Sequence, residues 1–326
     1  ITLGDVNGIG PEILARALAR PEVTAHCRPV VYGSARVLEE ARRFAPDMPT
    51  PRTVASINDA NTLSGDTIAV VDGGWMAPRV QPGVLDPEAG RCAIEWVKCA
   101  VLDARNGLTD GLVTCPISKE CVYKAGYHYI GHTELVAELS GAHDYRMCLF
   151  TDTMRIVHIT GHLSLRDALD HVKKDRIIRS AQIGYTALKA LGFAHPRIAV
   201  AGLNPHAGEA GAFGREEIEE IAPAVRACQE AGINCSGPYP PDTLFGKMRD
   251  GEFDMVIAMY HDQGHIPLKL IAMDEGVNVT LGTPLVRTSV DHGTAFDIAW
   301  QGKAREHSLI AAITLASKLA TARGHN

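Results

Sequence analysis

The stretch RIAVAGLNPHAGEAGAFGREEIEEIAPAVRACQEAG, residues 197–232, contains the unit from which the fold is built. A short apolar run comes first, a polar turn follows, and a long segment with apolar residues at helical spacing completes it. The same order returns along the chain. Strand-like runs occur at residues 29–33, 67–72, 110–114, 253–260 and 278–282, and helix-like segments at residues 34–45, 86–107, 215–232 and 307–322. This alternation predicts an α/β fold with a largely parallel sheet.

The bulk composition is that of an ordinary globular protein. The 326 residues are 46% hydrophobic and 21% charged, which is enough for one large or two ordinary domains. A net charge of -6 argues against nucleic acid as a partner, because phosphate backbones require clustered Lys and Arg. No apolar run approaches the roughly 20 residues of a membrane-spanning helix. We expect neither nucleic acid nor membrane binding.

The cysteines bear on the compartment. The chain has eight, scattered over strand-like, helix-like and loop segments, and no two form a CxxC pair. Such scatter is typical of free thiols in a reducing cytoplasm and not of a disulfide framework. The sequence begins at Ile1 without an initiator Met, so the cytoplasmic expectation rests on the cysteines alone.

Three strand-like runs end near a histidine, namely His162, His206 and His261. In sheets of this kind ligands bind at the carboxyl ends of the strands, so the three imidazoles are expected at the mouth of the sheet. Three histidines and an open position form a catalytic metal site in many enzymes. Alternatively, each histidine is a polar plug bonded to backbone, since no compact zinc motif is present. The repeated context favours a shared metal site.

Two loops are candidates for ligand binding. VRTSVDHGTAFDIAWQGKA, residues 286–304, is polar enough to hold a ligand on backbone N–H groups and hydroxyls, whereas helix capping would account for only one of its polar residues. LGDVNGIGPEI, residues 3–13, is a glycine-rich turn without the G-x-G-x-x-G dinucleotide fingerprint. A plain strand–turn–helix corner explains this second loop equally well.

Several side chains are candidates for holding an anion, because Arg binds carboxylate or phosphate through two bonds and Lys acts as a point charge. Taken singly, each is equally a solvated surface residue, and Thr133 in GHTE is equally a helix start. The candidates are Lys119, His132, Thr133, Lys269, Asn278 and Arg287.

Six motifs give the chain a resemblance to a known family. GDVNGIGPEI, GHTE, GLNPHAGE, FGREE, YHDQG and RTSVDHGTAFDIA, in order from residue 1 to about residue 305, resemble the motifs of 4-hydroxythreonine-4-phosphate dehydrogenases. That family shares the fold of isocitrate and isopropylmalate dehydrogenases, to whose motifs GIGPE and HGTAFDIAWQGKA are similar. The resemblance implies two α/β/α domains with an active-site cleft between them. The first would be residues 1–120 plus 280–326, and the second residues 121–279, carrying the metal histidines and dimer contacts.

The resemblance also implies roles for individual residues. One divalent metal per subunit (zinc, magnesium, manganese or cobalt) would be bound by ligands shared across a homodimer interface, namely His162, His206 and His261, with Asp242 and Asp262 as outer carboxylates. Substrate would be contacted by His132, Thr133, Lys269, Asn278 and Arg287. NAD, or NADP, would lie on the loop at residues 286–304, called the late loop below, at Asp291, His292, Gly293, Thr294 and Asp297. The resemblance does not identify the proton acceptor, for which Lys119 is one candidate.

The implied reaction is metal-dependent, NAD-linked oxidation of the C3 hydroxyl of a 4-phosphorylated four-carbon acid, followed by decarboxylation. One branch of the family uses 4-phosphohydroxy-L-threonine on the route to pyridoxal phosphate, and a sister branch uses 4-phospho-D-threonate or D-erythronate. HIPLKL after YHDQG departs from the LPVLK of the biosynthetic branch and favours the sister branch. A terephthalate cis-dihydrodiol dehydrogenase and a non-catalytic sugar-phosphate-binding protein are the alternatives. Arg287 in RTSVDHG favours a phosphorylated substrate.

Overall fold

The computed structural model describes residues 1–63, 66–129 and 131–324. The chain divides into two compact units, one of Ile1–His143 with Thr283–Gly324 and the other of Asp144–Gly282. The sequence placed the boundaries after residues 120 and 279, and residues 325–326 of its first domain lie outside the described residues. Among the described residues, no helix combines the length and the apolar character needed to cross a bilayer.

The strands of unit 1 are all parallel where they pair. β1 (Val31–Tyr32), β3 (Thr67–Val71) and β2 (Thr50–Val54) pair in that order, and β4 (Leu112–Thr114) pairs with β11 (Arg287–Val290). Single bridges from Thr2 to Tyr32 and to Thr114 join the two groups. Arg287 therefore lies on a strand that is paired directly with β4, although 173 residues separate it from Thr114.

The helices of unit 1 are α1 (Gly10–Leu18), α2 (Pro21–His26), α3 (Ala35–Ala41), α4 (Pro87–Arg105), α5 (Lys119–Lys124), α6 (His132–Ser140) and α12 (His307–Gly324), with short 3₁₀ turns at Arg42–Phe44 and Ile57–Thr62. The long helix α4 begins as its sequence predicts, because Asp86 accepts a hydrogen bond from the backbone of Glu88 and Pro87 occupies the first turn. It ends just before Gly107, whose φ of 72° suits glycine.

Helices α5 and α6 pack against α4, which is why unit 1 continues to His143. The approach of α5 is close: a Cβ on Gly90 of α4 would lie 2.6 Å from the carbonyl carbon of Cys121. A side chain at residue 90 would push α5 away. His132 and Thr133 on α6 consequently belong to the same unit as Arg287.

Unit 2 is built on a mixed sheet. Its strand order is β10 (Val277–Leu281), β5 (Arg146–Phe150), β6 (Arg155–His158), β9 (Met255–Ala258), β7 (Ile198–Ala201) and β8 (Cys235–Tyr239). The run from β6 to β8 is parallel, as the sequence predicted, whereas β5 is antiparallel to both of its neighbours. β5 and β6 form a hairpin through residues 151–154, a local feature that the alternating pattern did not reveal.

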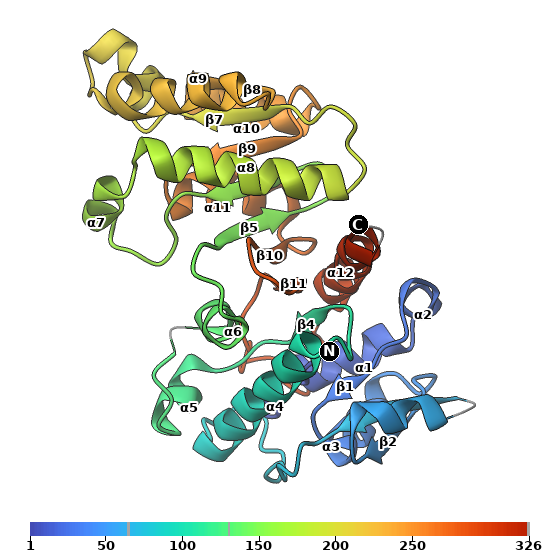
Figure 1. Cartoon of the computed structure of the whole chain (residues 1–326). Helices are drawn as coiled ribbons and strands as arrows, with labels where there is room; N and C mark the ends of the chain where they lie inside the picture. Colours follow the sequence, from blue (N-terminus) through green and yellow to red (C-terminus); the bar gives the residue numbers. More distant parts are fainter. Residues whose placement is uncertain (64–65, 130, 325–326) are drawn as a thin grey trace. The chain divides into compact units, whose positions relative to one another are not determined.

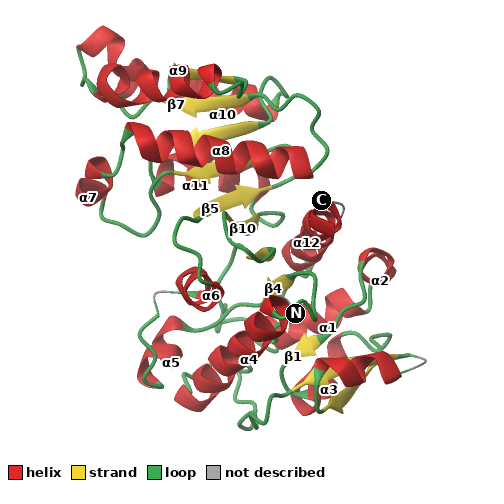
Figure 2. Cartoon of the chain, viewed as in Figure 1, coloured by secondary structure: helices red, strands yellow, loops and turns green. Residues whose placement is uncertain are grey.

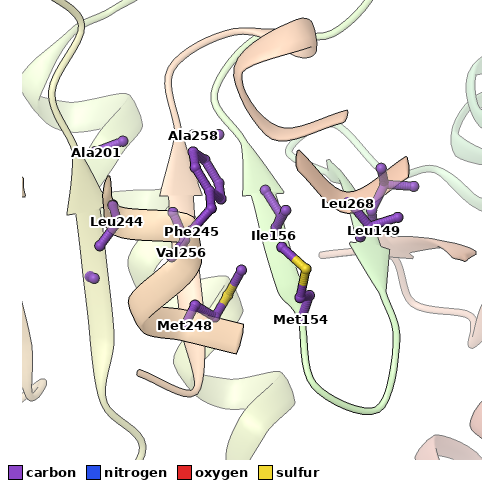
Figure 3. Close-up of a cluster of buried hydrophobic side chains, with 11 residues drawn as sticks. Leu149, Met154, Ile156, Ala201, Leu244, Phe245, Met248, Val256, Ala258 and Leu268 are labelled. Atoms are coloured by element: carbon purple, nitrogen blue, oxygen red, sulfur yellow. The ribbon is translucent and has the colours of Figure 1, made fainter. Parts of the chain in front are cut away.

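Helices cover both faces of this sheet: α7 (Leu165–Asp170), α8 (Lys174–Ala190), α9 (Ala222–Glu230), α10 (Pro241–Arg249) and α11 (His261–Ala272). Figures 1 and 2 show α8 crossing one face of the strands and α11 lying on the other. Alternate residues of β9 face opposite layers. Val256 joins Leu244 of α10 and Leu268 of α11 in a buried cluster (Figure 3), whereas Met255 lies against Gly184 of α8.

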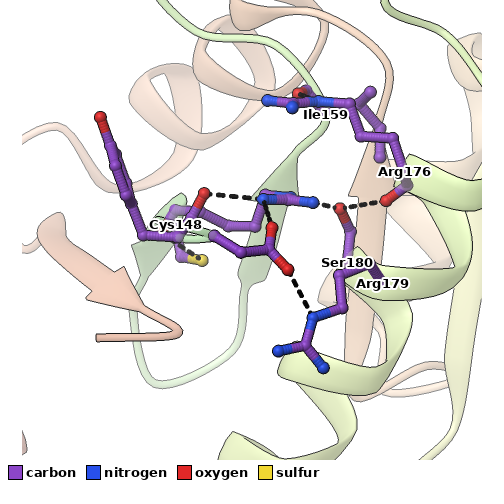
Figure 4. A network of polar contacts seen from close by, with 8 residues as sticks. Cys148, Ile159, Arg176, Arg179 and Ser180 are labelled. Carbon is purple, nitrogen blue, oxygen red and sulfur yellow. Dashed lines mark hydrogen bonds and ion pairs between the residues drawn. The ribbon is translucent and has the colours of Figure 1, made fainter. Parts of the chain in front are cut away.

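A network of polar contacts joins the beginning of β5 to α8 (Figure 4). The guanidinium of Arg146 is 4% exposed and donates to the Ser180 hydroxyl at 2.7 Å and to the Asp144 carboxylate at 2.6 Å. The Ser180 hydroxyl in turn donates to the carbonyl of Arg176, whose own side chain donates to the carbonyl of Ile159. A buried charge with this many partners fixes β5 relative to α8.

Candidate active site

The three predicted histidines all follow strands that are neighbours in the sheet of unit 2. β6, β9 and β7 are adjacent and parallel, so their carboxyl ends lie at one edge. His162 follows β6, His206 follows β7, and His261 follows β9 as the first residue of α11. His162 and His206 are exposed and His261 is half-buried, which leaves all three rings accessible.

His162 and His261 lie together. Both line a pocket of about 320 Å³ formed by residues 160–163 and 260–262 with Leu165 and Ala168, and their ring centroids are 6.0 Å apart. Nδ1 of His261 lies 2.6 Å from the carboxylate of Asp262. Because a carboxylate only accepts, Nδ1 carries a hydrogen, so Nε2 is the nitrogen with the lone pair in the neutral ring. This carboxylate–imidazole pair is the arrangement that orients metal-binding histidines.

His206 lies in a turn of unusual backbone geometry. The five residues from His206 to Ala210 have φ angles between 41° and 82°, and only Gly208 among them is glycine. The left-handed conformation costs a non-glycine residue about 1–2 kcal/mol. The buried carboxylate of Glu217 accepts from the backbone N–H groups of Leu203 and Asn204 at 2.7 and 2.8 Å and so holds the entry to the turn. Strain of this kind clusters at functional sites.

Gln263 connects the loops after β7 and β9, a role that sequence reasoning missed. Its amide oxygen accepts from the backbone of Met259 at 2.7 Å, and its amide nitrogen donates to the carbonyl of Gly202 at 2.8 Å. A buried glutamine that bonds the backbone of both loops fixes the start of α11 relative to the end of β7. The only sequence signal for this role was the position of Gln263 within YHDQG, because a side chain that bonds two loops does not occur at a characteristic spacing.

The donor set fits a divalent cation. Accessible neutral imidazoles and a neighbouring carboxylate are typical zinc-site groups, and His261 presents the required lone pair. Within the described residues of one chain, however, no three His, Cys, Asp or Glu side chains gather tightly enough to hold an ion. The resemblance implies ligands shared between two subunits. Asp242 lies exposed in the first turn of α10.

A second group of predicted residues surrounds Arg287 in unit 1. Arg287 is 2% exposed, and its guanidinium donates to the hydroxyls of Thr114 at 2.8 Å and Thr133 at 3.3 Å. Burial lowers its pKa to about 10, while the nearby Glu134 carboxylate raises it, so the side chain stays positive at neutral pH. The N-cap of α6 is Gly131 and not Thr133. The hydroxyl of Thr133 accepts a hydrogen bond from Arg287 instead.

His132 stays neutral beside this charge. Burial lowers its pKa well below the usual value, and the positive charges of Arg287 and Lys119 lower it further. Its Nε2 is buried and has no hydrogen-bond partner among the described residues. With its hydrogen on Nε2, the neutral ring would donate to an anion bound near the two cations and so satisfy this buried atom.

Lys269 and Asn278 belong to unit 2. Lys269 is half-buried on α11, and Asn278 lies on β10 opposite Leu149 of β5. The side-chain oxygen of Asn278 is buried and accepts no hydrogen bond in the described part of the chain. Like His132, this side chain has an unused polar atom that a ligand would satisfy.

The late loop packs on the N-terminal loop of unit 1. The carbonyl of Thr294 accepts from the backbone of Ile9 at 3.0 Å, and a Cβ on Gly8 would lie 3.0 Å from Thr294. Buried Glu12 accepts from the backbone of Gly302 and Ala304. The motifs GIGPE and HGTAFDIAWQGKA are therefore one packed structure. Residues 291–302 form loop and turns, and the predicted C-terminal helix follows as α12 from His307.

The predicted cofactor residues lie along this loop at differing depth. Asp291 and Thr294 are half-buried, whereas His292, Gly293 and Asp297 are exposed. Asn7 organises the neighbouring segment: its side chain accepts from the backbone of Gln81 at 2.8 Å and donates to the carbonyl of Val84 at 3.0 Å. Exposed polar groups on a loop that packs against the N-terminal loop and Glu12 suit a polar ligand such as a dinucleotide.

Known proteins resemble this chain over nearly its whole length. The family model "Pyridoxal phosphate biosynthetic protein PdxA" matches residues 25–316. D-threonate 4-phosphate dehydrogenase of Pectobacterium atrosepticum is 43% identical over 324 residues, covering 98% of both chains. The protein of that name from Cupriavidus necator is also 43% identical, covering 99% of this chain and 97% of the relative.

Solved structures of the same family also resemble this chain. A 4-hydroxythreonine-4-phosphate dehydrogenase from Klebsiella pneumoniae has a TM-score of 0.85 at 43% identity and covers 98% of both chains. A terephthalate 1,2-cis-dihydrodiol dehydrogenase from Burkholderia xenovorans reaches a TM-score of 0.67 at 33% identity, covering 97% of this chain and 96% of that one. A β-decarboxylating dehydrogenase from Thermococcus kodakarensis, 13% identical with a TM-score of 0.50, covers 97% of this chain and 80% of that one and shares the fold alone.

These likenesses confirm the fold class and the family predicted from the motifs. The chain belongs to the PdxA family and is an enzyme of the dehydrogenase class.

Proposed function

We propose that the enzyme oxidises the C3 hydroxyl of a 4-phosphorylated four-carbon hydroxy acid, with 4-phospho-D-threonate or D-erythronate preferred over 4-phosphohydroxy-L-threonine, and that the product loses its carboxyl group as carbon dioxide. The single observation that carries the proposal is the buried, positively charged Arg287 cluster in a chain 43% identical to enzymes named D-threonate 4-phosphate dehydrogenases. HIPLKL after YHDQG supports the same branch.

The chain's own residues bind and orient the substrate in this proposal. Arg287 provides a planar pair of donors for a phosphate or carboxylate, already aligned by the hydroxyls of Thr114 and Thr133. His132 stays neutral and would donate to the same anion from an N–H at Nε2. Lys119 adds a positive charge as an ammonium ion, and as a neutral amine it is the candidate proton acceptor. Lys269 and Asn278 contribute a further cation and a buried amide. Holding the reacting hydroxyl in one orientation lowers the barrier to its oxidation.

The two groups that the chain does not supply are a cation and a dinucleotide. We propose His162, His206 and His261 as the ligands of one divalent cation, which when bound would polarise the hydroxyl to be oxidised. NAD or NADP, held by Asp291, His292, Gly293, Thr294 and Asp297, would accept the hydride. The carboxylate of Asp262 fixes the tautomer of His261, and Asp242 is proposed as a further outer carboxylate.

We also propose a homodimer that completes the ligand set. Helix α11, whose first residue His261 lines the histidine pocket, carries apolar side chains that one chain leaves exposed: Ile266 is 58% and Leu270 82% exposed, and Met273, just after the helix, is 72% exposed. Leu163 and Leu165 line the pocket itself. An apolar surface of this kind marks an interface. A second copy is the partner we assign, because the resemblance implies ligands shared across subunits and the described residues of one chain do not assemble three.

A cytoplasmic location completes the proposal. All eight cysteines have free thiols, six of them buried, which is typical of proteins in reducing compartments.

Formation of NADH tests the proposed reaction. The purified enzyme is supplied with NAD, a divalent cation and, in turn, 4-phospho-D-threonate, 4-phospho-D-erythronate, 4-phosphohydroxy-L-threonine and a terephthalate cis-dihydrodiol, with carbon dioxide release and bound metal measured in parallel. We expect NADH and carbon dioxide with a phosphorylated acid, and loss of both in a folded His206→Ala variant. Turnover of the diol alone would identify the aromatic alternative, and absence of both metal and turnover would identify a binding protein.

A further inference from the structure

His261 and His265 are stacked on one face of α11. They lie one helical turn apart, their ring centroids are 3.6 Å apart, and their planes differ by 10°. The His261 side chain is 35% exposed, whereas His265 is 7% exposed. A buried ring therefore lies flat against the ring of the more accessible histidine. Offset or parallel contact between flat rings restricts the rotation of both about the side-chain bonds.

His265 is itself held in place. Its Nδ1 lies 3.0 Å from the carbonyl of His261, and because a carbonyl only accepts, this nitrogen carries the hydrogen. The ring of His158, at the end of β6, lies 4.7 Å away. Gly264 makes this approach feasible, because a Cβ there would lie 2.5 Å from Nε2 of His158. His265 thus joins the core of the unit to the ring of His261.

The ring of His261 is constrained from two directions. The carboxylate of Asp262 contacts its Nδ1 edge at 2.6 Å, which sets the tautomer. His265 covers one face, which sets the plane of the ring. A bond at one edge still allows the ring to swing, whereas a flat contact on a buried support does not. Together the two neighbours define where the Nε2 lone pair points.

We propose that His265 is a positioning residue that holds the imidazole of His261 in the orientation required to bind a divalent cation. The inference rests on the proposed function, in which His261 is a ligand. His265 contributes through the flat face of its ring, so an aromatic ring without nitrogen would replace it and an aliphatic side chain of similar size would not. Groups that orient a ligand in this way affect metal affinity by about 10- to 100-fold.

The test compares His265→Leu and His265→Phe in the full chain. Zn²⁺ affinity is measured by competition with a chromophoric chelator, and the visible absorption of bound Co²⁺ reports the geometry of the ligands. We expect His265→Leu to bind Zn²⁺ about 10- to 100-fold more weakly with an altered Co²⁺ spectrum, and His265→Phe to keep the wild-type affinity and spectrum. The control His195→Leu changes an exposed histidine of the same unit and leaves both unchanged.

Wild-type affinity and spectrum in folded His265→Leu would overturn the inference. So would a His265→Phe variant as weak as His265→Leu, because the ring face would then contribute nothing. If His265→Leu does not fold, as judged by circular dichroism, the His265→Phe measurement alone decides. The variant His261→Ala separates the two proposals. If the wild type binds neither Zn²⁺ nor Co²⁺, or if His261→Ala binds both ions as tightly as the wild type does, His261 is not a ligand and the proposed function is refuted.

Discussion

The guanidinium of Arg287 donates to the hydroxyl of Thr114 at 2.8 Å across the parallel pair formed by β11 and β4. The bond orients a buried cation through a neutral partner, so the positive charge is not neutralised by it. Because burial lowers the pKa of Arg287 only to about 10, a positive charge persists at neutral pH inside the protein. A charge of this kind attracts an anionic group strongly, since the surroundings screen it weakly.

Arg287→Lys should reduce kcat/KM for the phosphorylated acid by about tenfold to a hundredfold. The lysine keeps the charge but loses the planar pair of donors, and hydrogen bonds to charged groups contribute about 1.5–3 kcal/mol. Steady-state kinetics of NADH formation measure the effect. Arg52→Lys, at an exposed position on β2, is the control and should match the wild type. Unchanged kinetics in Arg287→Lys would remove this residue from substrate binding.

Asp262→Asn should weaken divalent-cation binding by about 10- to 100-fold, because the carboxylate at 2.6 Å from Nδ1 of His261 sets the tautomer and strengthens the ring as a donor. Isothermal titration with Zn²⁺ provides the measurement. Asp250→Asn alters an exposed carboxylate after α10 and should bind like the wild type. Equal affinities for Asp262→Asn and the wild type would show that this pair does not serve a metal.

Leu270→Glu should convert a dimer into a monomer and lower the amount of bound metal. Leu270 is 82% exposed on α11, and burial of a leucine at an interface contributes about 1.5–3 kcal/mol from each copy. Sedimentation equilibrium gives the mass. The control Leu102→Glu changes a leucine of α4 that is 56% exposed and should leave the mass unaltered. A fully active monomer would contradict the shared ligand set.

Gly264→Ala and Gly246→Ala should change stability in opposite directions. A Cβ on Gly264 would lie 2.5 Å from Nε2 of His158 and 2.7 Å from Ile156, so overpacking should lower the free energy of unfolding by about 1–3 kcal/mol. Gly246, on α10, has nothing within 4 Å of its Cβ position. Alanine there should raise the free energy of unfolding by about 0.5–1 kcal/mol. Urea titrations measure the free energy of unfolding of both variants. A change of the same sign in the two variants would contradict this interpretation.

Asp5→Asn should remove a pH dependence of stability. Burial raises the pKa of Asp5 from 3.8 to about 6, so the folded state retains the proton to higher pH than the unfolded state does. Its contribution to stability is complete below pH 3.8 and is lost as the pH rises to about 6, a loss of about 3 kcal/mol.

The free energy of unfolding of the wild type relative to Asp5→Asn should therefore fall between pH 4 and 6 and stay constant above. Asp110→Asn, at an exposed position of the same unit, serves as the control. A difference between wild type and Asp5→Asn that is independent of pH would mean that the Asp5 carboxyl does not titrate in this range.

Local structure followed from local sequence in most places. The run at residues 197–203 forms β7, and the segment at residues 86–107 forms α4 with the predicted ends. The antiparallel hairpin of β5 and β6 was not predicted, because pairing direction depends on which strands meet and not on their composition. Packing on Glu12 and the N-terminal loop holds residues 291–302 in turns, and the predicted C-terminal helix follows as α12.

The sequence by itself determined the alternation of strands and helices, the family, and the histidines that follow β6, β7 and β9, because periodicity and motifs are local and survive without coordinates. Only the tertiary structure decided that His261 lies between Asp262 and His265, that Thr133 serves Arg287, and that Gln263 joins two loops. The contacts of Thr133 with Arg287 and of Gln263 with Gly202 join segments far apart along the chain, and packing of the layers brings them together. The contacts of His261 lie within one helix, where the side-chain rotamers and not the spacing set the position of each ring.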